Sequence, residues 1–295
     1  MKHTPTVSVV IPAYNEEGAI EKCLESFLDQ TVKPLEIIVV DNRSTDRTSA
    51  IVKSFRAKYK DELNIRLLKQ FDKQGIVPTR DYGMSRAKGD VIGRIDADST
   101  LEETWVEAVQ EAFKDPEVAA ASGPVVYHDM PAHNVGFRAD NQIRSTLDKL
   151  AKSHRFLFGS NMAVRKTVWH DILPHLCQDE EDKMHEDIDI ALHLHSEGYK
   201  VAYVSDMAGG MSARRLEDSP KDFYRYVMRF ENTYKNHHIK SASARIPIFI
   251  YLTTYFPLKF LRFTYDGDEQ KFTFDKFREV IKRRRGDDED HEIVI

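Results

Sequence analysis

The sequence predicts an α/β fold in which a mostly parallel central sheet is flanked by helices and followed by a helical C-terminal appendage. Two observations predict this class. Apolar, β-branched runs alternate with helical patterns through about the first 125 residues, which is typical of a parallel sheet covered by helices on both faces. Polar residues follow directly after these runs, at the sheet edge where open parallel sheets bind their ligands.

The expected elements follow one another regularly in this first part. Near-continuous apolar runs predict strands over residues 7–11, 36–40, 65–68 and 91–95. Helical patterns separate these runs over residues 16–30, 45–59 and 76–88. After about residue 119 the alternation gives way to strand-like pieces and loops, and two later helices are expected over residues 186–197 and 220–236.

The chain is therefore expected to have three parts. Residues 1–215 form the main α/β domain. Residues 216–285 form a helical extension that packs on this domain, makes a dimer contact or touches a membrane surface. Residues 286–295 continue an acidic block and are expected to be disordered.

Composition and simple spacings limit the function. The net charge of -5 gives no reason to expect nucleic-acid binding. Cys23 and Cys177 lie far apart without metal-ligand spacing, as ordinary cysteines of a reducing compartment do. His193 and His195 lie on different faces of a helical pattern, which argues against joint metal binding. There is no signal-peptide pattern and no apolar run of the roughly 18–20 residues that a membrane span needs, so we expect a cytoplasmic protein.

The run at residues 89–98 is the most informative in the chain. An apolar strand ends there in Asp96-Ala97-Asp98, and two carboxylates spaced i, i+2 beyond a strand can reach one ligand. Hard oxygen donors of this kind suit Mn²⁺ or Mg²⁺, which would also hold phosphate oxygens. Because such pairs also occur in solvated turns, the meaning of this one depends on the motifs around it.

The first strand leads into an acidic turn at residues 12–17, without the glycine-rich sequence of a dinucleotide-binding sheet. Pro12 is expected to stiffen the turn, Tyr14 to stack on a base, and Glu16 to add negative charge. The alternative is a plain loop in which Asn15 caps the following helix.

The second strand also ends in polar residues. Asp41 can accept a hydrogen bond from the imide N–H that uracil or thymine presents. For Asp46 the favoured role is capping of the next helix, because the residues around it are ordinary helix-start residues.

Together these segments resemble the family 2 glycosyltransferases of GT-A fold. The resemblance rests on residues 7–17, 41–48 and 96–98, and on three further segments in the family's order at 75–83, 159–165 and 185–189. These last three read Gly-Ile-Val-Pro-Thr-Arg-Asp-Tyr-Gly, Gly-Ser-Asn-Met-Ala-Val-Arg and His-Glu-Asp-Ile-Asp. Asp81 departs from the usual Arg-Asn-x-Gly ending of the first of them. The similarity covers roughly residues 7–215 and implies a GT-A catalytic domain.

The resemblance implies transfer of a sugar from a nucleotide-diphospho-sugar, with UDP favoured, to an acceptor hydroxyl with inversion. Asp187 is then the general base, and Glu186 beside it binds the acceptor or positions the loop. Gly159 and Asn161 are expected to line the acceptor pocket. Without the preceding motifs, the carboxylates at 186–189 would be interpreted as an acidic helix start.

The resemblance also implies a donor site with a bound Mn²⁺ or Mg²⁺. Asp98 is expected to be the metal ligand, and Asp96 to contact the ribose or a metal-bound water. Arg80 is either near the ribose and diphosphate or a surface charge of its helix. The family's later His ligand is missing from residues 209–215, where Arg214 or Arg215 could contact the diphosphate instead. The expected donor-binding residues are Pro12, Tyr14, Glu16, Asp41, Arg80, Asp96, Ala97 and Asp98.

Two other functions fit part of the pattern. A nucleotidyltransferase would need a glycine-rich, basic loop after the first strand, which residues 12–17 do not provide. A catalytically weak nucleotide-sugar-binding protein would show a damaged metal or base position, and both positions are intact. The Gln-x-x-Arg-Trp motif of processive synthases is missing after the base, which favours addition of one or a few sugars.

Residues 246–263 are densely apolar and aromatic but interrupted by prolines and cations. They suit packing on the main domain, a homodimer interface, or shallow attachment to an anionic membrane. For the last alternative, Lys259, Arg262 and the cluster at 282–285 would add positive charge. It would place the protein on the inner face of the membrane with a lipid-linked acceptor, whereas a glycan acceptor needs no membrane contact.

Overall fold

The computed structural model describes residues 3–131, 157–179, 181–239, 245–266 and 271–274. Seven of its strands form the main sheet: β1 (Val7–Ala13), β2 (Glu36–Asp41), β3 (Ile65–Lys69), β4 (Val91–Ile95), β6 (Val118–Ser122), β8 (Asn161–Arg165) and β9 (Lys200–Tyr203). Two small sheets are formed by β5 (Thr100–Leu101), β7 (Val125–Tyr127) and β10 (Gly209–Met211), and by β11 (Tyr265–Asp266) and β12 (Lys271–Phe272).

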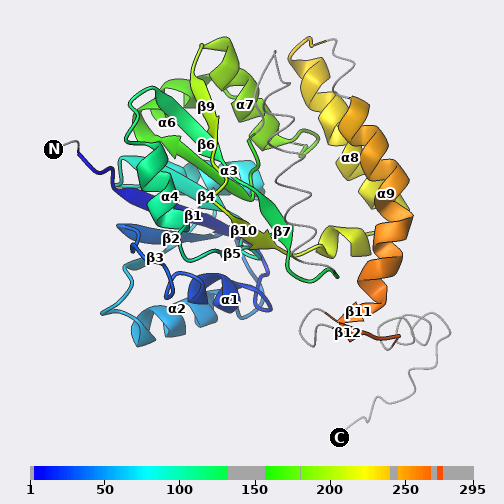
Figure 1. The fold of residues 1–295 in the computed structure, drawn as a ribbon, viewed down its shortest axis with the longest axis horizontal. Helices are drawn as coiled ribbons and strands as arrows, with labels where there is room; N and C mark the ends of the chain where they lie inside the picture. Colours follow the sequence, from blue (N-terminus) through cyan, green and yellow to red (C-terminus); the bar gives the residue numbers. More distant parts are fainter. Residues whose placement is uncertain (1–2, 132–156, 180, 240–244, 267–270, 275–295) are drawn as a thin grey trace, which may run out of the picture.

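The described helices are α1 (Ile20–Glu25), α2 (Thr48–Lys58), α3 (Ile76–Met84), α4 (Trp105–Ala112), α6 (Lys166–Ile172), α7 (Glu186–Ser196), α8 (Pro220–Asn236) and α9 (Arg245–Phe263), with the 3₁₀ helices η1 (Leu173–His175) and η2 (Arg214–Glu217). The main sheet has the strand order β3-β2-β1-β4-β8-β6-β9 (Figure 1). The first four strands in this order are parallel, and β8 runs antiparallel to both neighbours. The mostly parallel sheet predicted from the sequence is thus confirmed.

Helices cover both faces of this sheet, as the apolar runs predicted. Successive side chains of a strand point to opposite faces, so Val9 and Ile11 join the core under α1, α2 and α4. Val10 points the other way and joins the core under α3, α6 and α7. Both faces of β1 are therefore buried, which explains why its sequence is apolar without alternation.

The predicted strands are confirmed within two residues, but the first helices are shorter than the patterns indicated. α1 begins only at Ile20, because residues after the first strand form turns. It ends at Glu25, and Gln30 instead donates side-chain hydrogen bonds to the carbonyls of Ser26 and Glu102. α8 matches its predicted bounds, with Ser219 accepting the N-cap hydrogen bond from the backbone of Asp222.

The C-terminal extension consists of α8 and α9, which lie side by side next to the sheet domain (Figure 1). Phe223 and Val227 of α8 pack on Tyr255 of α9. On its other side, α8 buries Tyr234 against α7. The expected boundary at residue 215 falls inside η2, and the expected acidic tail and the basic cluster at 282–285 lie outside the described residues.

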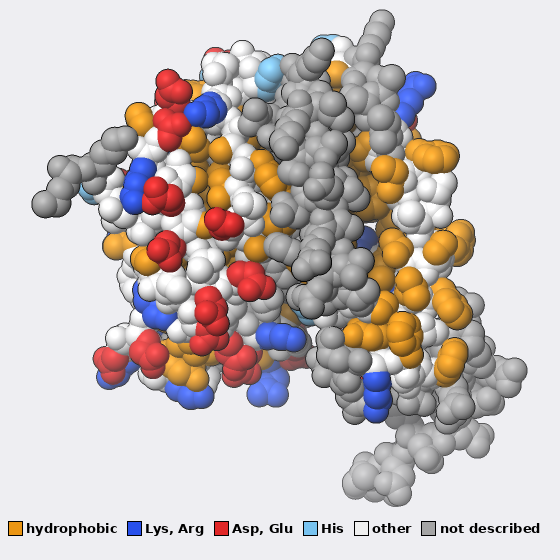
Figure 2. All heavy atoms as spheres, in the orientation of Figure 1, with side chains coloured by type: hydrophobic (Ala, Val, Ile, Leu, Met, Phe, Trp, Pro, Cys, Tyr) orange, Lys and Arg blue, Asp and Glu red, His pale blue; other side chains and the backbone are white. Residues whose placement is uncertain are grey.

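α9 has one face turned to the protein and one turned away. Phe249, Phe256 and Phe260 are exposed, and hydrophobic side chains gather over this helix in Figure 2. Arg262 is buried and ion-paired with Asp129, so the expectation that it adds charge to a membrane surface was wrong. A charged side chain on a helix is either exposed to water or paired with an opposite charge, and Arg262 is paired with Asp129. Across the ranges that the structure describes, no helix is long and apolar enough to cross a membrane.

Candidate functional site

The first half of the site lies beyond the carboxyl ends of β1 and β4. Glu16 follows β1 and Asp98 follows β4, and the guanidinium of Arg214 joins them. Arg214 donates to both oxygens of Glu16 at 2.7 and 2.6 Å, and its Nε lies 3.0 Å from Asp98 Oδ2. Arg214 lies in η2, 198 residues after Glu16 in the sequence. Its positive charge therefore lies where the sequence predicted a metal ion.

Asp98 lies in a buried and negatively charged environment. Burial raises the pKa of Asp98 to about 6, the charges of Asp96 and Glu16 add to the shift, and Arg214 opposes it. A carboxylate cluster with hard oxygen donors fits a divalent cation such as Mn²⁺ or Mg²⁺. A pocket of about 250 Å³ adjoins Asp98 and is also lined by Thr100 and Ser212.

Arg94 connects this half of the site to the second half. Its Nη2 atom lies 2.9 Å from Asp96 Oδ1 and 3.1 Å from Glu186 Oε1, and its side chain is only 3% exposed. None of the sequence motifs pointed to this residue. The signal was present, because a charge inside the apolar run of β4 must find a partner when the strand is buried.

Asp187 lies at the start of α7 with both carboxylate oxygens oriented by the backbone. The N–H of Gly159 donates to Oδ2 at 2.9 Å and the N–H of Ile188 donates to Oδ1 at 2.8 Å. A Cβ on residue 159 would lie 1.8 Å from Arg94 Nη1 and 3.3 Å from Glu186 Oε1, so a larger residue would push the Arg94 guanidinium out of place. Gly159 thus holds the carboxylate in place, while its role in acceptor binding stays a prediction.

The environment shifts the pKa values of the two neighbouring carboxylates of α7 in opposite directions. Burial, followed by the charge of Glu186, raises the pKa of Asp187. Burial acts the same way on Glu186, but the charges of Arg94 and Arg80 outweigh it and lower the pKa of Glu186. Such a separation is what distinguishes a base from a permanently charged neighbour.

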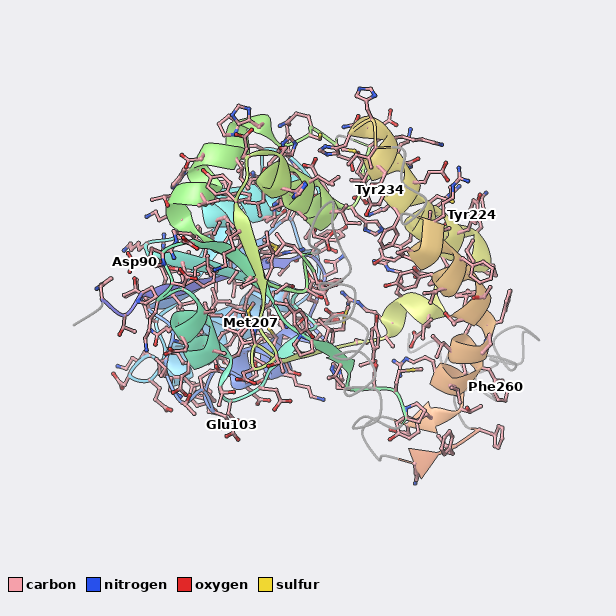
Figure 3. All side chains as sticks on the ribbon, turned by 45° about the horizontal axis from the view of Figure 1, so that its top comes forward. Asp90, Glu103, Met207, Tyr224, Tyr234 and Phe260 are labelled. Carbon is pink, nitrogen blue, oxygen red and sulfur yellow. The ribbon has the colours of Figure 1, made fainter. Side chains whose placement is uncertain are left out.

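α8 packs against α7, the helix that carries Asp187. Burial raises the pKa of Tyr234 to about 12, and the nearby charge of Asp187 adds to the shift. Tyr234 is buried on α8 whereas Tyr224 is exposed, as labelled in Figure 3. The C-terminal extension therefore contributes a wall next to the predicted base.

Two loops that precede α1 and α2 are tied together. Asn15 does not cap α1, because its Oδ1 accepts from the backbone N–H of Thr45 at 2.8 Å. Asp46 accepts from the N–H of Thr48, the first residue of α2, as its capping role predicted, and also from the N–H of Glu17. Tyr14 is left 51% exposed beside these loops, and its stacking role stays a prediction.

Asp41 is fully buried at the end of β2. Its carboxylate accepts from the N–H of Ser44 at 3.0 Å and from the side chains of Ser49 and Lys69. Burial alone raises its pKa, but these hydrogen bonds, with Lys69 first, lower it. The carboxylate therefore stays charged and is engaged by the protein, and its recognition of a base stays a prediction.

Arg80 is not a surface charge, so that alternative was wrong. It is 1% exposed on α3, donates to Asp81 Oδ1 at 2.9 and 2.7 Å, and lies 5.4 Å over the ring of Trp169. Its charge lowers the pKa of Glu186 after Arg94. Arg80 thus lies near Glu186, and contact with the ribose or diphosphate stays a prediction.

Three other predicted residues serve the sheet directly. Pro12 lies not in the turn but inside β1, where it pairs with Val40 of β2. The pairing of β1 with β4 ends at Val10, so the missing N–H of Pro12 costs no hydrogen bond to β4. Ala97 is buried in the core. Asn161 Oδ1 accepts a hydrogen bond from Trp105 Nε1 at 2.7 Å, and its Nδ2 donates to the carbonyls of Pro124 and Met207. Its role in binding the sugar acceptor stays a prediction.

Comparisons with known proteins agree with this fold and site. The profile described as Glycosyl transferase family 2 matches residues 8–173, and that of Glycosyl transferase family group 2 matches residues 91–256. Glycosyltransferase AglE of Haloferax volcanii is 26% identical over 226 residues, which are 75% of this chain and 71% of the relative. Glycosyltransferase GlyG of Streptococcus pneumoniae is 30% identical over 136 residues, which are 46% of this chain and 44% of that protein.

Solved structures extend the likeness in fold to nearly the whole chain. A mannosyltransferase of Pyrobaculum calidifontis, in complex with GDP-Man and Mn²⁺, matches with a TM-score of 0.60 at 19% identity, covering 96% of this chain and 80% of that one. TarS 1–349 of S. aureus, in complex with UDP-GlcNAc, matches with a TM-score of 0.54 at 17% identity, covering 95% and 92%. The GT-A fold is thus confirmed, and the chain belongs to glycosyltransferase family 2.

Proposed function

We propose that this glycosyltransferase moves a sugar from a nucleotide-diphospho-sugar to an acceptor hydroxyl with inversion. The observation that carries the proposal is the paired arrangement around Arg94. The carboxylates of Asp96 and Asp98 lie on one side of it, and the oriented carboxylate of Asp187 lies on the other. The sequence favours a UDP-sugar as donor, because a carboxylate such as Asp41 could accept from an imide N–H; in the structure Asp41 is fully buried and accepts from Ser44, Ser49 and Lys69.

Asp98 would hold the Mn²⁺ or Mg²⁺ ion, with Asp96 next to it. When bound, the cation would neutralise negative charge on the departing nucleoside diphosphate. Arg214 has two roles in this proposal: it compensates the charge of Asp98 before the donor arrives, and it is close enough to pair with the diphosphate afterwards. The pKa of Asp98 is raised first by burial and then by the charges of Asp96 and Glu16, and a bound cation would oppose this shift as Arg214 does.

Asp187 would act as the general base. It takes the proton of the acceptor hydroxyl while the acceptor oxygen bonds to the anomeric carbon and the bond to the diphosphate breaks. The raised pKa of Asp187 makes it a stronger base than an ordinary aspartate. Glu186, kept charged by Arg94, would bind the acceptor or fix the position of α7.

The acceptor would be a glycan or a lipid-linked glycan. For a lipid-linked acceptor, the outward face of α9 is the surface that could meet an anionic bilayer. We expect wild-type protein to float with anionic liposomes at low salt, Phe256→Glu to lose this, and Phe71→Glu, at another exposed aromatic, to keep it. If the wild-type protein does not float with the liposomes, membrane attachment is ruled out, and α9 serves for packing or for a homodimer contact.

Release of nucleoside diphosphate tests the proposed function. Purified protein is incubated with UDP-, GDP- and dTDP-sugars, with Mn²⁺ or with EDTA, and thermal shifts are recorded in parallel. We expect one nucleotide class to raise the melting temperature and to be hydrolysed or transferred only with the metal present. A protein that binds a nucleotide-sugar without any turnover would instead support the catalytically weak alternative.

A further inference from the structure

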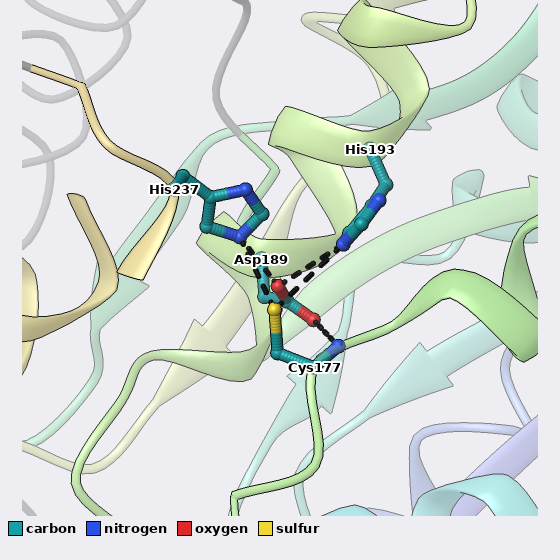
Figure 4. Close-up of side chains that lie close together, drawn as sticks. All are labelled: Cys177, Asp189, His193 and His237. Carbon is teal, nitrogen blue, oxygen red and sulfur yellow. Dashed lines mark hydrogen bonds and ion pairs between the residues drawn. The ribbon is translucent and has the colours of Figure 1, made fainter. Parts of the chain in front are cut away.

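Four side chains from three segments meet away from the glycosyltransferase site. They are Cys177, which follows η1, Asp189 and His193 of α7, and His237, which directly follows α8 (Figure 4). One donor atom of each lies within 4.8 Å of the others. Asp189 is 3% exposed, and the other three are partly buried.

Two of these residues share one face of α7, and the other two lie just beyond the ends of η1 and α8. Asp189 and His193 are four residues apart on α7, so they share a face. The backbone N–H of Cys177 donates to Asp189 Oδ2 at 3.1 Å, which leaves Oδ1 directed at the two histidines. His237 arrives from α8, and the spacing of 60 residues from Cys177 explains why no local motif revealed the cluster.

Three distances between the donor atoms lie near those of a tetrahedral metal site, and all four atoms lie within 4.8 Å of one another. Cys177 Sγ lies 3.8 Å from His193 Nε2 and 3.6 Å from His237 Nε2, and His193 Nε2 lies 3.5 Å from Asp189 Oδ1. Bonds of about 2.0–2.3 Å at tetrahedral angles put neighbouring ligand atoms about 3.3–3.6 Å apart. The hydrogen-bonded pair of His237 and Asp189, at 2.6 Å, needs only a small opening.

We propose that Cys177, Asp189, His193 and His237 bind a Zn²⁺ ion that fixes α7 to the end of α8. One thiolate, two imidazoles and one carboxylate form a donor set that suits zinc and closes a four-coordinate structural site. Asn236 Nδ2 donates to Cys177 Sγ at 3.0 Å, which is the outer-shell contact that stabilises a bound thiolate. Zinc binding displaces the proton of the thiol.

The consequence for catalysis rests on the proposed function. α7 carries Glu186 and Asp187 in its first turn, and the backbone N–H of His185 donates to Thr233 of α8 at 2.9 Å. A zinc ion near the middle of α7 would therefore hold the base-bearing end of this helix against α8. Removal of the ion would then loosen Asp187 without touching the donor site.

Metal content and Co²⁺ spectra test the site without any sugar-transfer assay. The full chain, without a histidine tag, is assayed for zinc by mass spectrometry, and metal-free protein is titrated with Co²⁺ and with Zn²⁺ against a chromophoric chelator. We expect one zinc per chain and a thiolate-to-cobalt absorption band. Cys177→Ser should lose the band, and His237→Gln should weaken zinc binding by more than about 100-fold, beyond a typical outer-shell effect.

Three controls separate this site from others in the chain. Cys23→Ala removes the other cysteine, and His195→Gln removes an exposed histidine of the same helix; both should keep zinc and the band. Asp98→Asn should keep zinc even if it abolishes donor binding. The zinc site and the proposed function can therefore fail independently of each other.

Wild-type protein that neither contains zinc nor shows the cobalt band would overturn the proposal and leave a hydrogen-bonded network. Retention of zinc by Cys177→Ser would also overturn it. If a variant fails to fold, the cobalt titration of the wild type still decides.

Discussion

Two arginines at the site each hold a pair of carboxylates, and they differ in exposure. Arg94 joins Asp96 to Glu186 with its side chain 3% exposed. Arg214 joins Glu16 to Asp98 with its side chain 51% exposed. A buried cation cannot leave without stranding buried charge, whereas an exposed one can move into water at little cost. In the proposed site, the charge of Glu186 is therefore neutralised permanently, and Asp98 is neutralised by a group that a metal could displace.

The largest expected effect comes from removing the base on the side that Arg94 organises. Asp187→Asn keeps the shape of the side chain but removes the basic oxygen, so we expect turnover to fall by about 10²–10⁴ with donor binding roughly intact. Steady-state kinetics and donor titration measure the two quantities separately, with the exposed Asp206→Asn as a control. Loss of donor affinity with unchanged turnover would make Asp187 a binding residue.

The contrast between the arginines predicts unequal effects on stability. Arg94→Met leaves Asp96 and Glu186 without their buried partner, and we expect the free energy of unfolding to fall by about 3–5 kcal/mol. Arg214→Gln removes a half-exposed cation from Asp98 and Glu16, whose side chains are 7% and 12% exposed, and should cost less, about 1–3 kcal/mol. Urea denaturation of both variants checks this, and equal losses would remove the distinction between a permanent and an exchangeable cation.

A smaller effect concerns the residue that precedes the catalytic carboxylates. Burial lowers the pKa of His185 to about 4, and Tyr226 and Phe230 contact its ring. The unfolded chain, with a pKa of about 6.5, binds the proton more readily between these values. The free energy of unfolding should therefore fall as the pH drops from about 6.5 to about 4, by up to ~3 kcal/mol at about 1.4 kcal/mol per pKa unit.

His185→Phe isolates this contribution, because it keeps an aromatic ring in the contact and removes the titration. We expect the variant to lose less stability than the wild type between pH 7 and pH 4. Urea denaturation at several pH values gives the two curves. Parallel curves would mean that His185 is not the titrating group.

The sequence allowed accurate prediction of features that depend on neighbouring residues. The buried strands were predicted correctly because β1 and β4 each coincide with a local apolar run, and local motifs also singled out Asp98 and Asp187, whose roles stay predictions. Arg94 was missed because its partner Glu186 is 92 residues away, and the bond between Glu16 and Arg214 spans 198 residues. The helix α1 was overextended because turn hydrogen bonds and Gln30, set by tertiary contacts, end it early.

Binding of Mn²⁺ is the most direct test of an exchangeable cation at the donor site. The free Mn²⁺ signal in electron paramagnetic resonance gives affinities for the wild type, Arg214→Gln and Asp98→Asn, with Cys177→Ser as a control for the proposed zinc site. If Arg214 competes with the metal, Arg214→Gln should bind Mn²⁺ about tenfold more tightly, equal to about 1.4 kcal/mol, and Asp98→Asn should lose binding. Equal Mn²⁺ affinities in all of these proteins would contradict a metal site at Asp98.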